Sequence, residues 1–227
     1  MRGVFVTGTD TGVGKTVVGC ALAKALTGFG ETVAVRKPVE SGCEPAGEAL
    51  HPADGDALRR AADEREPLDV VTPLRLRHAL SPERAARLEQ MDLELYDLIA
   101  AARTGEAGDF YLVEGAGGFL SPLAQGALNA DLAMALELPV LVVVADRLGC
   151  INHALLTVEA IEHRGLNIAA VVVNAVTAEI DGDMNNREDL ESRLPYPVLS
   201  FGHGEDVDAA ERLSRLFTAR RTTNEHE

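Results

Sequence analysis

A glycine-rich segment near the amino end holds residues whose types and spacing could do chemistry. It runs from Gly8 to Thr16 as Gly-Thr-Asp-Thr-Gly-Val-Gly-Lys-Thr, between a short apolar run and a stretch of helix length. Glycines let backbone N–H groups turn toward a phosphate, and the start of a helix adds partial positive charge. Lys15 is placed to reach the β- and γ-phosphate oxygens, and the Thr16 hydroxyl to hold Mg²⁺. The segment therefore predicts a phosphate-binding loop.

The spacing of this loop departs from the usual one in one place. The usual pattern, G-x-x-x-x-G-K, puts a glycine where Thr9 stands, and Gly8 comes one residue too early. A glycine-rich turn that binds nothing would carry similar residues. Gly-Lys-Thr after a predicted strand and before a predicted helix favours a variant phosphate loop instead.

Three later segments place polar residues where predicted strands end. Lys37 follows residues 32–35, and the carboxyl end of a parallel strand is where such sheets bind ligands. Glu114 follows residues 110–113, at a position that suits a second Mg²⁺ ligand, and the glycines after it permit close backbone approach. After residues 140–145, a helix start offers N–H groups that suit a carboxylate. Each of these segments also has a purely structural interpretation. Lys37 could be an exposed lysine at a strand end, Glu114 part of an ordinary turn, and the third segment simply a capped helix.

Apolar runs alternate with helix-length segments along the chain. Strands are predicted at residues 4–7, 32–35, 110–113, 140–145 and 168–173, and helices at 15–26, 54–62, 92–103, 129–136, 152–164 and 206–217. Runs of Val, Leu and Ala without polar alternation indicate strands buried on both faces, as in parallel sheets covered by helices. We expect an α/β fold with a mostly parallel sheet and helices on both faces. Residues 1–217 would form its single domain, and residues 218–227 a frayed polar tail.

Composition argues against several classes of protein. The 227 residues include 21 Lys and Arg against 36 Asp and Glu, and the net charge of −15 argues against nucleic acid or an anionic membrane as a partner. No apolar run reaches the length of about 18 residues that a membrane span needs, and no signal peptide is recognised. Cys20, Cys43 and Cys150 are scattered without a C-x-x-C pattern. They fit a reducing cytosol, so we expect a cytoplasmic protein.

Several motifs together resemble those of the dethiobiotin synthetases, which use ATP and Mg²⁺ to close the ureido ring in biotin synthesis. They are GTDTGVGKT at 8–16, KPVESG at 37–42, VEGAGG at 113–118, LGCINHALLT at 148–157 and the strand-end Asn174. The resemblance implies a P-loop NTPase-type fold and a homodimer. It also implies the conversion of 7,8-diaminopelargonic acid, CO₂ and ATP to dethiobiotin, ADP and phosphate. That reaction would pass through a carbamate and a carbamic–phosphoric anhydride.

The resemblance also implies roles for single residues. The catalytic residues would be Lys37, Lys15 and Thr11, and the substrate would contact Ser41, Cys150, Ile151 and Asn152. The nucleotide would contact Gly12, Val13, Gly14, Lys15, Thr16, Val17, Asp56, Glu114, Gly115, Ala116, Gly117, Asn174 and Ala175. Mg²⁺ would be held by Thr16, Glu114 and an aspartate. Asp54 and Asp56 are both available, and we prefer Asp56 because Asp-Ala-Leu has the look of the family and opens a helix.

Two other functions share the phosphate loop. A small-molecule kinase usually has an arginine-rich lid, whereas the arginines here are dispersed. A partitioning-type ATPase switch that is recruited to membranes would need a basic amphipathic helix at the carboxyl end, and Glu211 opposes that reading. The segment at residues 200–205 also lacks the Ile-Pro pair of the family's base-binding loop, so we expect some use of triphosphates other than ATP.

Overall fold

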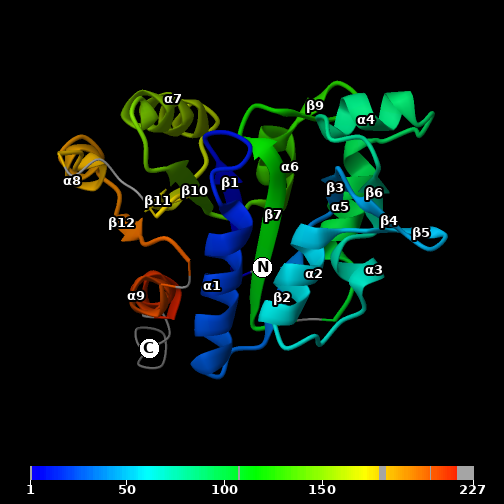
Figure 1. Ribbon diagram of the computed structural model, residues 1–227, viewed down its shortest axis with the longest axis horizontal. Coiled ribbons are helices and arrows are strands. Elements are labelled where there is room, and N and C mark those ends of the chain that lie inside the picture. Colours follow the sequence, from blue (N-terminus) through cyan, green and yellow to red (C-terminus); the bar gives the residue numbers. More distant parts are fainter. Residues whose placement is uncertain (1, 107, 179–182, 205, 219–227) are drawn as a thin grey trace.

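A six-stranded parallel sheet runs through the middle of the computed structural model, which describes residues 2–106, 108–178, 183–204 and 206–218 (Figure 1). Its strands are β1 (Gly3–Gly8), β2 (Val33–Arg36), β7 (Phe110–Gly118), β10 (Val140–Ala145), β11 (Ile168–Asn174) and β12 (Val198–Phe201). They lie in the order β12-β11-β10-β1-β7-β2, and every neighbouring pair is parallel. All their carboxyl ends therefore meet at one edge of the sheet, the upper edge in Figure 1.

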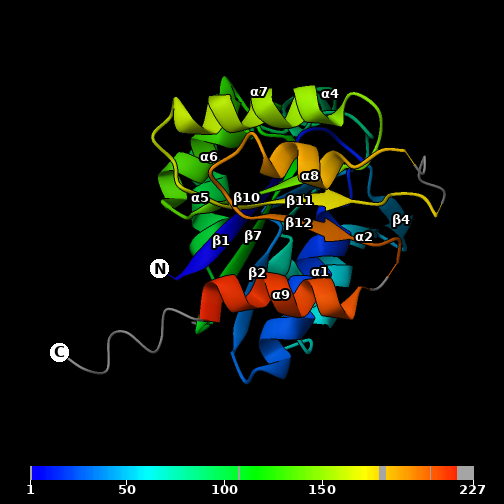
Figure 2. The same cartoon turned by 90° about the vertical axis from the view of Figure 1, so that its left-hand side faces the viewer.

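Helices cover both faces of this sheet, as Figures 1 and 2 show. One face carries α1 (Lys15–Gly28), α2 (Ala53–Ala61) and α9 (Val207–Thr218), and the other carries α5 (Leu95–Arg103), α6 (Asn129–Leu136), α7 (Cys150–Glu162) and α8 (Asn186–Glu191). Successive side chains of a strand point to opposite faces. Accordingly, Val142 packs in the core beneath α6 and α7, and Val143 packs in the core beneath α1 and α9. The predicted α/β fold with a parallel sheet and helices on both faces is confirmed.

The longer elements agree with the sequence-based prediction, and the short ones were missed. β10 and α6 have the predicted bounds. The missed elements are β3 (Val39–Ser41), β4 (Glu44–Ala46), β5 (Ala49–His51), α3 (Leu68–Val71), β6 (Leu74–Leu76), α4 (Pro82–Leu88), β8 (Pro122–Ala124), β9 (Ala127–Leu128), α8 and β12. Most span only two to four residues, too few to show a hydrophobic period.

The carboxyl end of the described chain is helical. α9 ends at Thr218, and the rest of the predicted tail lies outside the described residues. None of the helices in the described part of the chain has the length and apolar character that a bilayer crossing requires. Cys20, Cys43 and Cys150 are free cysteines.

Candidate active site

The glycine-rich loop between β1 and α1 has the backbone of an anion-binding loop. Gly12 and Gly14 have φ angles of +75° and +91°, in the left-handed region that favours glycine. A Cβ at Gly14 would lie 2.1 Å from Nδ2 of Asn174, which donates a 3.0 Å hydrogen bond to the carbonyl of Val13. No side chain caps the start of α1 within the described chain. Its first N–H groups thus stay available to phosphate oxygens.

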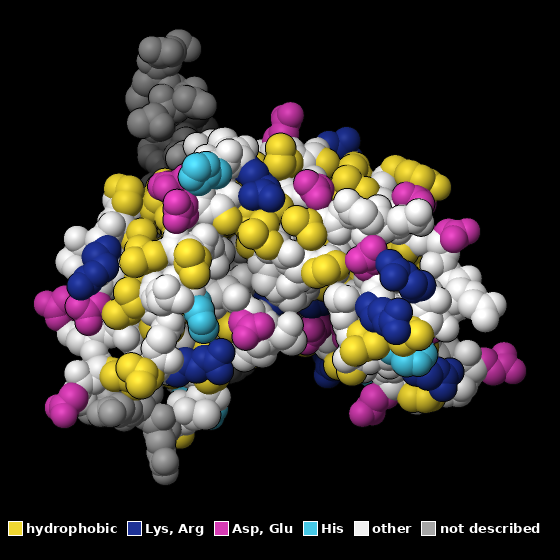
Figure 3. Space-filling model, turned by 90° about the horizontal axis from the view of Figure 1, so that it is seen from above, with side chains coloured by type: hydrophobic (Ala, Val, Ile, Leu, Met, Phe, Trp, Pro, Cys, Tyr) yellow, Lys and Arg dark blue, Asp and Glu magenta, His cyan; other side chains and the backbone are white. Residues whose placement is uncertain are grey.

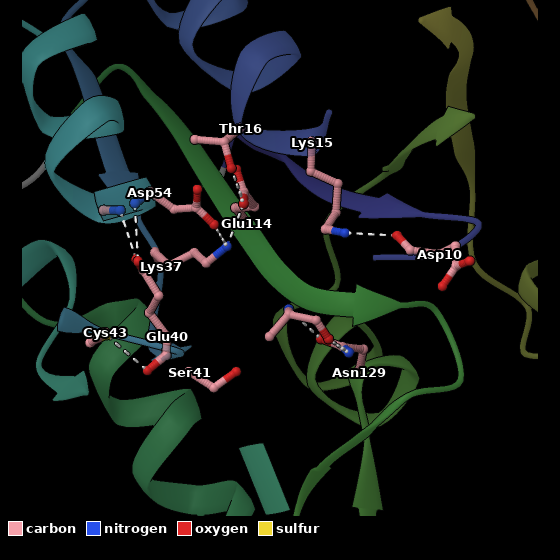
Figure 4. A network of polar contacts seen from close by, with 12 residues as sticks. Asp10, Lys15, Thr16, Lys37, Glu40, Ser41, Cys43, Asp54, Glu114 and Asn129 are labelled. Carbon is pink, nitrogen blue, oxygen red and sulfur yellow. Dashed lines mark hydrogen bonds and ion pairs between the residues drawn. The ribbon is translucent and has the colours of Figure 1, made fainter. Parts of the chain in front are cut away.

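A buried lysine lies between two carboxylates close to this loop (Figure 4). The Nζ atom of Lys37 lies 2.5 Å from Oε1 of Glu114 and 2.9 Å from Oδ2 of Asp54. Thr16 donates a 2.9 Å hydrogen bond from its hydroxyl to the same Oε1. Lys37 is 3% exposed and Glu114 is fully buried. The segment after β2, the strand β7 and the helices α1 and α2 therefore bring their polar side chains to one point.

Glu114 does not follow its strand, as the sequence had suggested, but lies within it. β7 continues through the glycines to Gly118. The extension is possible because the side chain of Asn129, at the start of α6, supplies hydrogen bonds in place of a neighbouring strand. Its Oδ1 accepts from the N–H of Ala116 at 3.0 Å, and its Nδ2 donates to the carbonyls of Ala116 and Gly118. Nothing in the sequence pattern singled out Asn129, since an asparagine at a helix start is ordinarily a cap.

Charge interactions in the cluster shift the pKa values of its groups. Burial lowers the pKa of Lys37, but the carboxylates of Glu114 and Asp54 outweigh burial, so this pKa lies above its usual value. Burial raises the pKa of Asp54, but the Lys37 ammonium outweighs it and the net pKa is lowered. The pKa of Lys15 is lowered by burial and also by the nearby charge of Lys37. Lys37 is thus held as a cation between two anions.

The structure distinguishes the two aspartates at the start of α2. Asp54 meets Lys37, whereas Asp56 is bound by the guanidinium groups of Arg59 and Arg60, at 3.1 and 2.6 Å. Side chains two residues apart on an α-helix are separated by about 200° around its axis, so the two carboxylates point in nearly opposite directions. Asp56, our preferred metal ligand from the sequence, therefore lies apart from Thr16 and Glu114, and Asp54 takes its place beside them.

A cavity of about 550 Å³ opens above the cluster at the carboxyl ends of the strands. Its lining consists of Thr11, Gly12, Gly14, Lys15, Thr16, Val17, Lys37, Glu40, Ser41, Asp54, Ala79, Leu80, Ser81, Pro82, Ala116, Gly117 and Ser121. Figure 3, which views the molecule from this edge, shows a hollow between two lobes. Both lysines with predicted catalytic roles and most of the predicted phosphate contacts therefore share one cavity.

The other predicted site residues lie under or outside this cavity. Val13, Glu114 and Ala175 are buried, and Gly115 packs against Asn129. Asn174, predicted to read the base, uses its amide nitrogen to hold the phosphate loop. Cys150, Ile151 and Asn152 form the start of α7 and are not among the lining residues.

A buried ion pair that the sequence analysis missed supports the end of β2. Arg36 donates to both oxygens of Glu66, at 2.5 and 2.9 Å, and to the carbonyl of Thr104 at 2.8 Å. The Arg36 and Glu66 side chains are 1% and 7% exposed. Because Arg36 directly precedes Lys37, this pair fixes the backbone from which the lysine extends.

Comparison with known proteins gives this geometry a family. A family model described as "AAA domain" matches residues 2–203. The ATP-dependent dethiobiotin synthetase of Anaeromyxobacter sp. (strain K) is 48% identical over 221 residues, which cover 95% of this chain and 96% of that protein. The enzyme of the same name from Pseudomonas aeruginosa is 42% identical over 201 residues, 88% of each chain. The chain belongs to the dethiobiotin synthetase family. This is an enzyme family of ligases that form carbon–nitrogen bonds.

Solved structures add a likeness of fold. The cell division ATPase MinD of Pyrococcus furiosus superposes with a TM-score of 0.54 and 18% sequence identity, covering 97% of this chain and all of that one. At this identity the likeness concerns the P-loop NTPase fold alone. The fold of this chain therefore agrees with the P-loop NTPase-type fold that the sequence predicted.

The oxygen atoms of this dethiobiotin synthetase site fit a magnesium ion. Thr16, Asp54 and Glu114 offer a hydroxyl and two carboxylates, the hard donors that Mg²⁺ prefers. Oε2 of Glu114 is buried without a hydrogen-bond partner among the described residues, so one donor is left free for a ligand. No group of three or more His, Cys, Asp or Glu side chains with metal-binding geometry occurs in the described chain. A Mg²⁺ ion here would keep waters and take phosphate oxygens, as this ion usually does.

Proposed function

We propose that this chain synthesises dethiobiotin from 7,8-diaminopelargonic acid, CO₂ and ATP. The observation that carries the proposal is that Lys15 and Lys37 line the same cavity as a phosphate-binding loop, in a chain of this family. Phosphoryl transfer asks a protein mainly to align the reactants and to stabilise negative charge. Lys15 at the start of α1 and Lys37 just after β2 meet that need.

The proposed reaction divides into three steps. An amine of the substrate adds to CO₂, loses a proton and becomes a carbamate. A carbamate oxygen then attacks the γ-phosphorus of ATP, the bond to ADP breaks, and a carbamic–phosphoric anhydride forms. The second amine attacks the carbonyl carbon of that anhydride, phosphate leaves with the bonding electrons, and the amine proton is released as the ring closes.

The chain's own residues have separate tasks in this scheme. The backbone N–H groups of residues 12–17 and the Lys15 ammonium would hold the phosphates, with Thr11 at the rim of the cavity. The Lys37 ammonium would lie between the carbamate and the γ-phosphate and offset charge as the oxygen attacks. Ser41, which donates a 2.7 Å hydrogen bond to the carbonyl of Leu80, would contact the diamine from the opposite wall.

We assign the magnesium ion to Thr16, Asp54 and Glu114, with Asp54 in place of Asp56. When bound, the ion would neutralise charge on the β- and γ-phosphate oxygens. Lys37 already contacts two of these ligands, so its position and the ion's would be linked. Asn174 remains a proposed contact of the base, through the Oδ1 atom that has no hydrogen-bond partner among the described residues.

The two aspartates give a matched pair of variants. Asp54→Asn should raise the Mg²⁺ concentration needed for half-maximal activity by about tenfold or more, because it removes a charged oxygen from the ion. Asp56→Asn should change it by less than about twofold, since that carboxylate pairs with Arg59 and Arg60. A Mg²⁺ titration of activity, with calorimetry of Mg²⁺–nucleotide binding, measures both. A larger effect of Asp56→Asn than of Asp54→Asn would show that Asp56 is the metal ligand.

Labelled carbon dioxide tests the proposed function directly. With 7,8-diaminopelargonic acid, ATP and Mg²⁺, the chain should release phosphate and incorporate one carbon from ¹³CO₂, which mass spectrometry detects in the product. Samples purged of CO₂ serve as the control and should release little phosphate. A small-molecule kinase would instead transfer phosphate to the substrate without CO₂, and that outcome would overturn the proposal.

A second copy of the chain is proposed to complete each site. Leu148, just before α7, is 91% exposed, and Leu156 on the helix is 58% exposed, so this region presents apolar surface that a homodimer would cover. The start of α7, at residues 150–152, would then bind the substrate carboxylate through its N–H groups and the side-chain amide of Asn152, from the partner subunit. We further propose that the protein works in the cytoplasm, where its free cysteines would stay reduced.

Mixed dimers test this arrangement. Lys37→Gln and Asn152→Ala homodimers should each be weak in the ring-closing reaction, and co-expression of the two variants should recover up to about a quarter of the wild-type rate. The recovery follows because half of the dimers are mixed and each mixed dimer keeps one intact composite site. Tag-purified mixed dimers, in which one of the two sites is intact, should reach up to about half of the wild-type rate. No recovery in verified mixed dimers would place each site within one chain.

A further inference from the structure

Glu40 is a buried carboxylate that the proposed reaction does not use. It lies in β3, is 6% exposed and lines the cavity (Figure 4). Its Oε1 accepts from the N–H of Asp54 at 3.0 Å and its Oε2 accepts from the N–H of Gly55 at 2.9 Å. These are the second and third residues of α2, whose own N-cap, Pro52, supplies no side-chain hydrogen bond. Glu40 therefore caps α2 from a different element of the fold.

The start of α2 is also confined at Gly55. A Cβ at Gly55 would lie 1.9 Å from Oγ1 of Thr72, so only glycine fits between Thr72 and Glu40. The first turn of α2 thus has little room to shift. This restriction bears most on the position of Asp54. Glu40 holds the backbone N–H of Asp54, and the Asp54 carboxylate contacts Lys37.

One short segment holds both ends of Asp54. Lys37 binds its carboxylate and Glu40, three residues later, binds its N–H. Asp54 also contrasts with Asp56, which shares the helix but pairs with Arg59 and Arg60. The hydrogen bonds that Glu40 accepts from Asp54 and Gly55 restrict the rotation of the first turn, and this rotation determines which aspartate faces the cluster.

We propose that Glu40 is a positioning residue for the metal site: it holds the start of α2 so that the Asp54 carboxylate stays beside Thr16 and Glu114. This inference rests on the proposed function, in which Asp54 is a magnesium ligand. Residues that orient a ligand change metal affinity by about 10- to 100-fold when they are removed. A plain helix cap would change stability and leave metal affinity as it was.

The experiment measures metal affinity without turnover. Mn²⁺ is titrated into the full-length protein saturated with a non-hydrolysable ATP analogue, and free Mn²⁺ is counted by electron paramagnetic resonance. Glu40→Ala should weaken Mn²⁺ binding by about tenfold or more, and Glu40→Gln, which keeps an acceptor oxygen, by less. Affinity for the analogue in EDTA should change by less than about twofold in both variants. Asp109→Asn is the matched control, because Asp109 also accepts a backbone N–H, from Thr32 at 3.0 Å, at the other end of the sheet.

A double-mutant cycle shows whether Glu40 acts through Asp54. In an Asp54→Asn background, Glu40→Ala should weaken Mn²⁺ binding by less than about twofold more, because the group that it positions is already gone. Fully additive losses would overturn the inference. So would an Asp54→Asn variant that binds Mn²⁺ weakly beside a Glu40→Ala variant that binds it normally. Normal Mn²⁺ binding by Asp54→Asn would instead overturn the metal assignment on which the inference rests.

Discussion

Lys37→Gln should lower kcat by about 10²- to 10³-fold while the affinity for nucleotide changes by only a few fold. Glutamine keeps much of the length and hydrogen-bonding capacity of the side chain but removes the charge. The Lys37 cation would act mainly on charge that develops during phosphoryl transfer, so its loss should appear in kcat. The phosphate loop and Lys15 would still bind the ground state. Steady-state kinetics and calorimetric nucleotide titrations separate the two effects.

The same change should also alter the stability of the protein without ligands. Without the ammonium, the buried Glu114 and the Asp54 carboxylate lose their shared cation and repel each other. We expect a lower melting temperature for the variant, partly restored by Mg²⁺ and nucleotide. Lys24→Gln is the control, because it removes a charge from α1 at a position outside the cavity around Lys37. A variant that kept most of its kcat would remove Lys37 from the proposed mechanism.

Glu66→Ala should lower the free energy of unfolding by about 3–5 kcal/mol. The variant leaves the fully buried guanidinium of Arg36 without its anion, and an unpaired buried charge is costly. Denaturation with urea measures the change. The double variant Arg36→Met with Glu66→Leu should recover much of the loss, since apolar side chains often replace buried ion pairs with little penalty. A loss below about 1 kcal/mol for Glu66→Ala would show that the pair contributes little.

The large features of the fold could be predicted because they leave a local signal. β10 is a run of six buried apolar residues, and its buried pattern alone indicates a central parallel strand. The region between β2 and α5 leaves no such signal. β4 is exposed along its whole length and pairs with β5 in a short antiparallel hairpin, whose Leu50 carbonyl also accepts a 3.2 Å hydrogen bond from Arg75. Elements of only three residues are too short to show a hydrophobic period along the chain.

The candidate site divides in a similar way. Lys15, Lys37 and Glu114 could be singled out because they sit at or near the ends of strands that the sequence predicts, and the structure brings them close together. The choice between Asp54 and Asp56 depended on the rotation of α2, which changes by about 100° for each residue of error in its start. Partners such as Glu66, Asn129 and Glu40 act on arginine or backbone groups far away in sequence, and no spacing rule finds them.

The raised pKa of Lys37 also bears on how an enzyme that handles CO₂ treats its own amines. Only a neutral amine has the lone pair with which to attack CO₂, and an ammonium has none. Lys37, which Glu114 and Asp54 keep protonated, is thereby protected from becoming a carbamate itself. Lys15 has the opposite tendency, since burial lowers its pKa, but bound phosphates would raise that pKa again. The two carboxylates thus do more than hold a lysine in place. In the proposed reaction they keep Lys37 from competing with the substrate amine for CO₂.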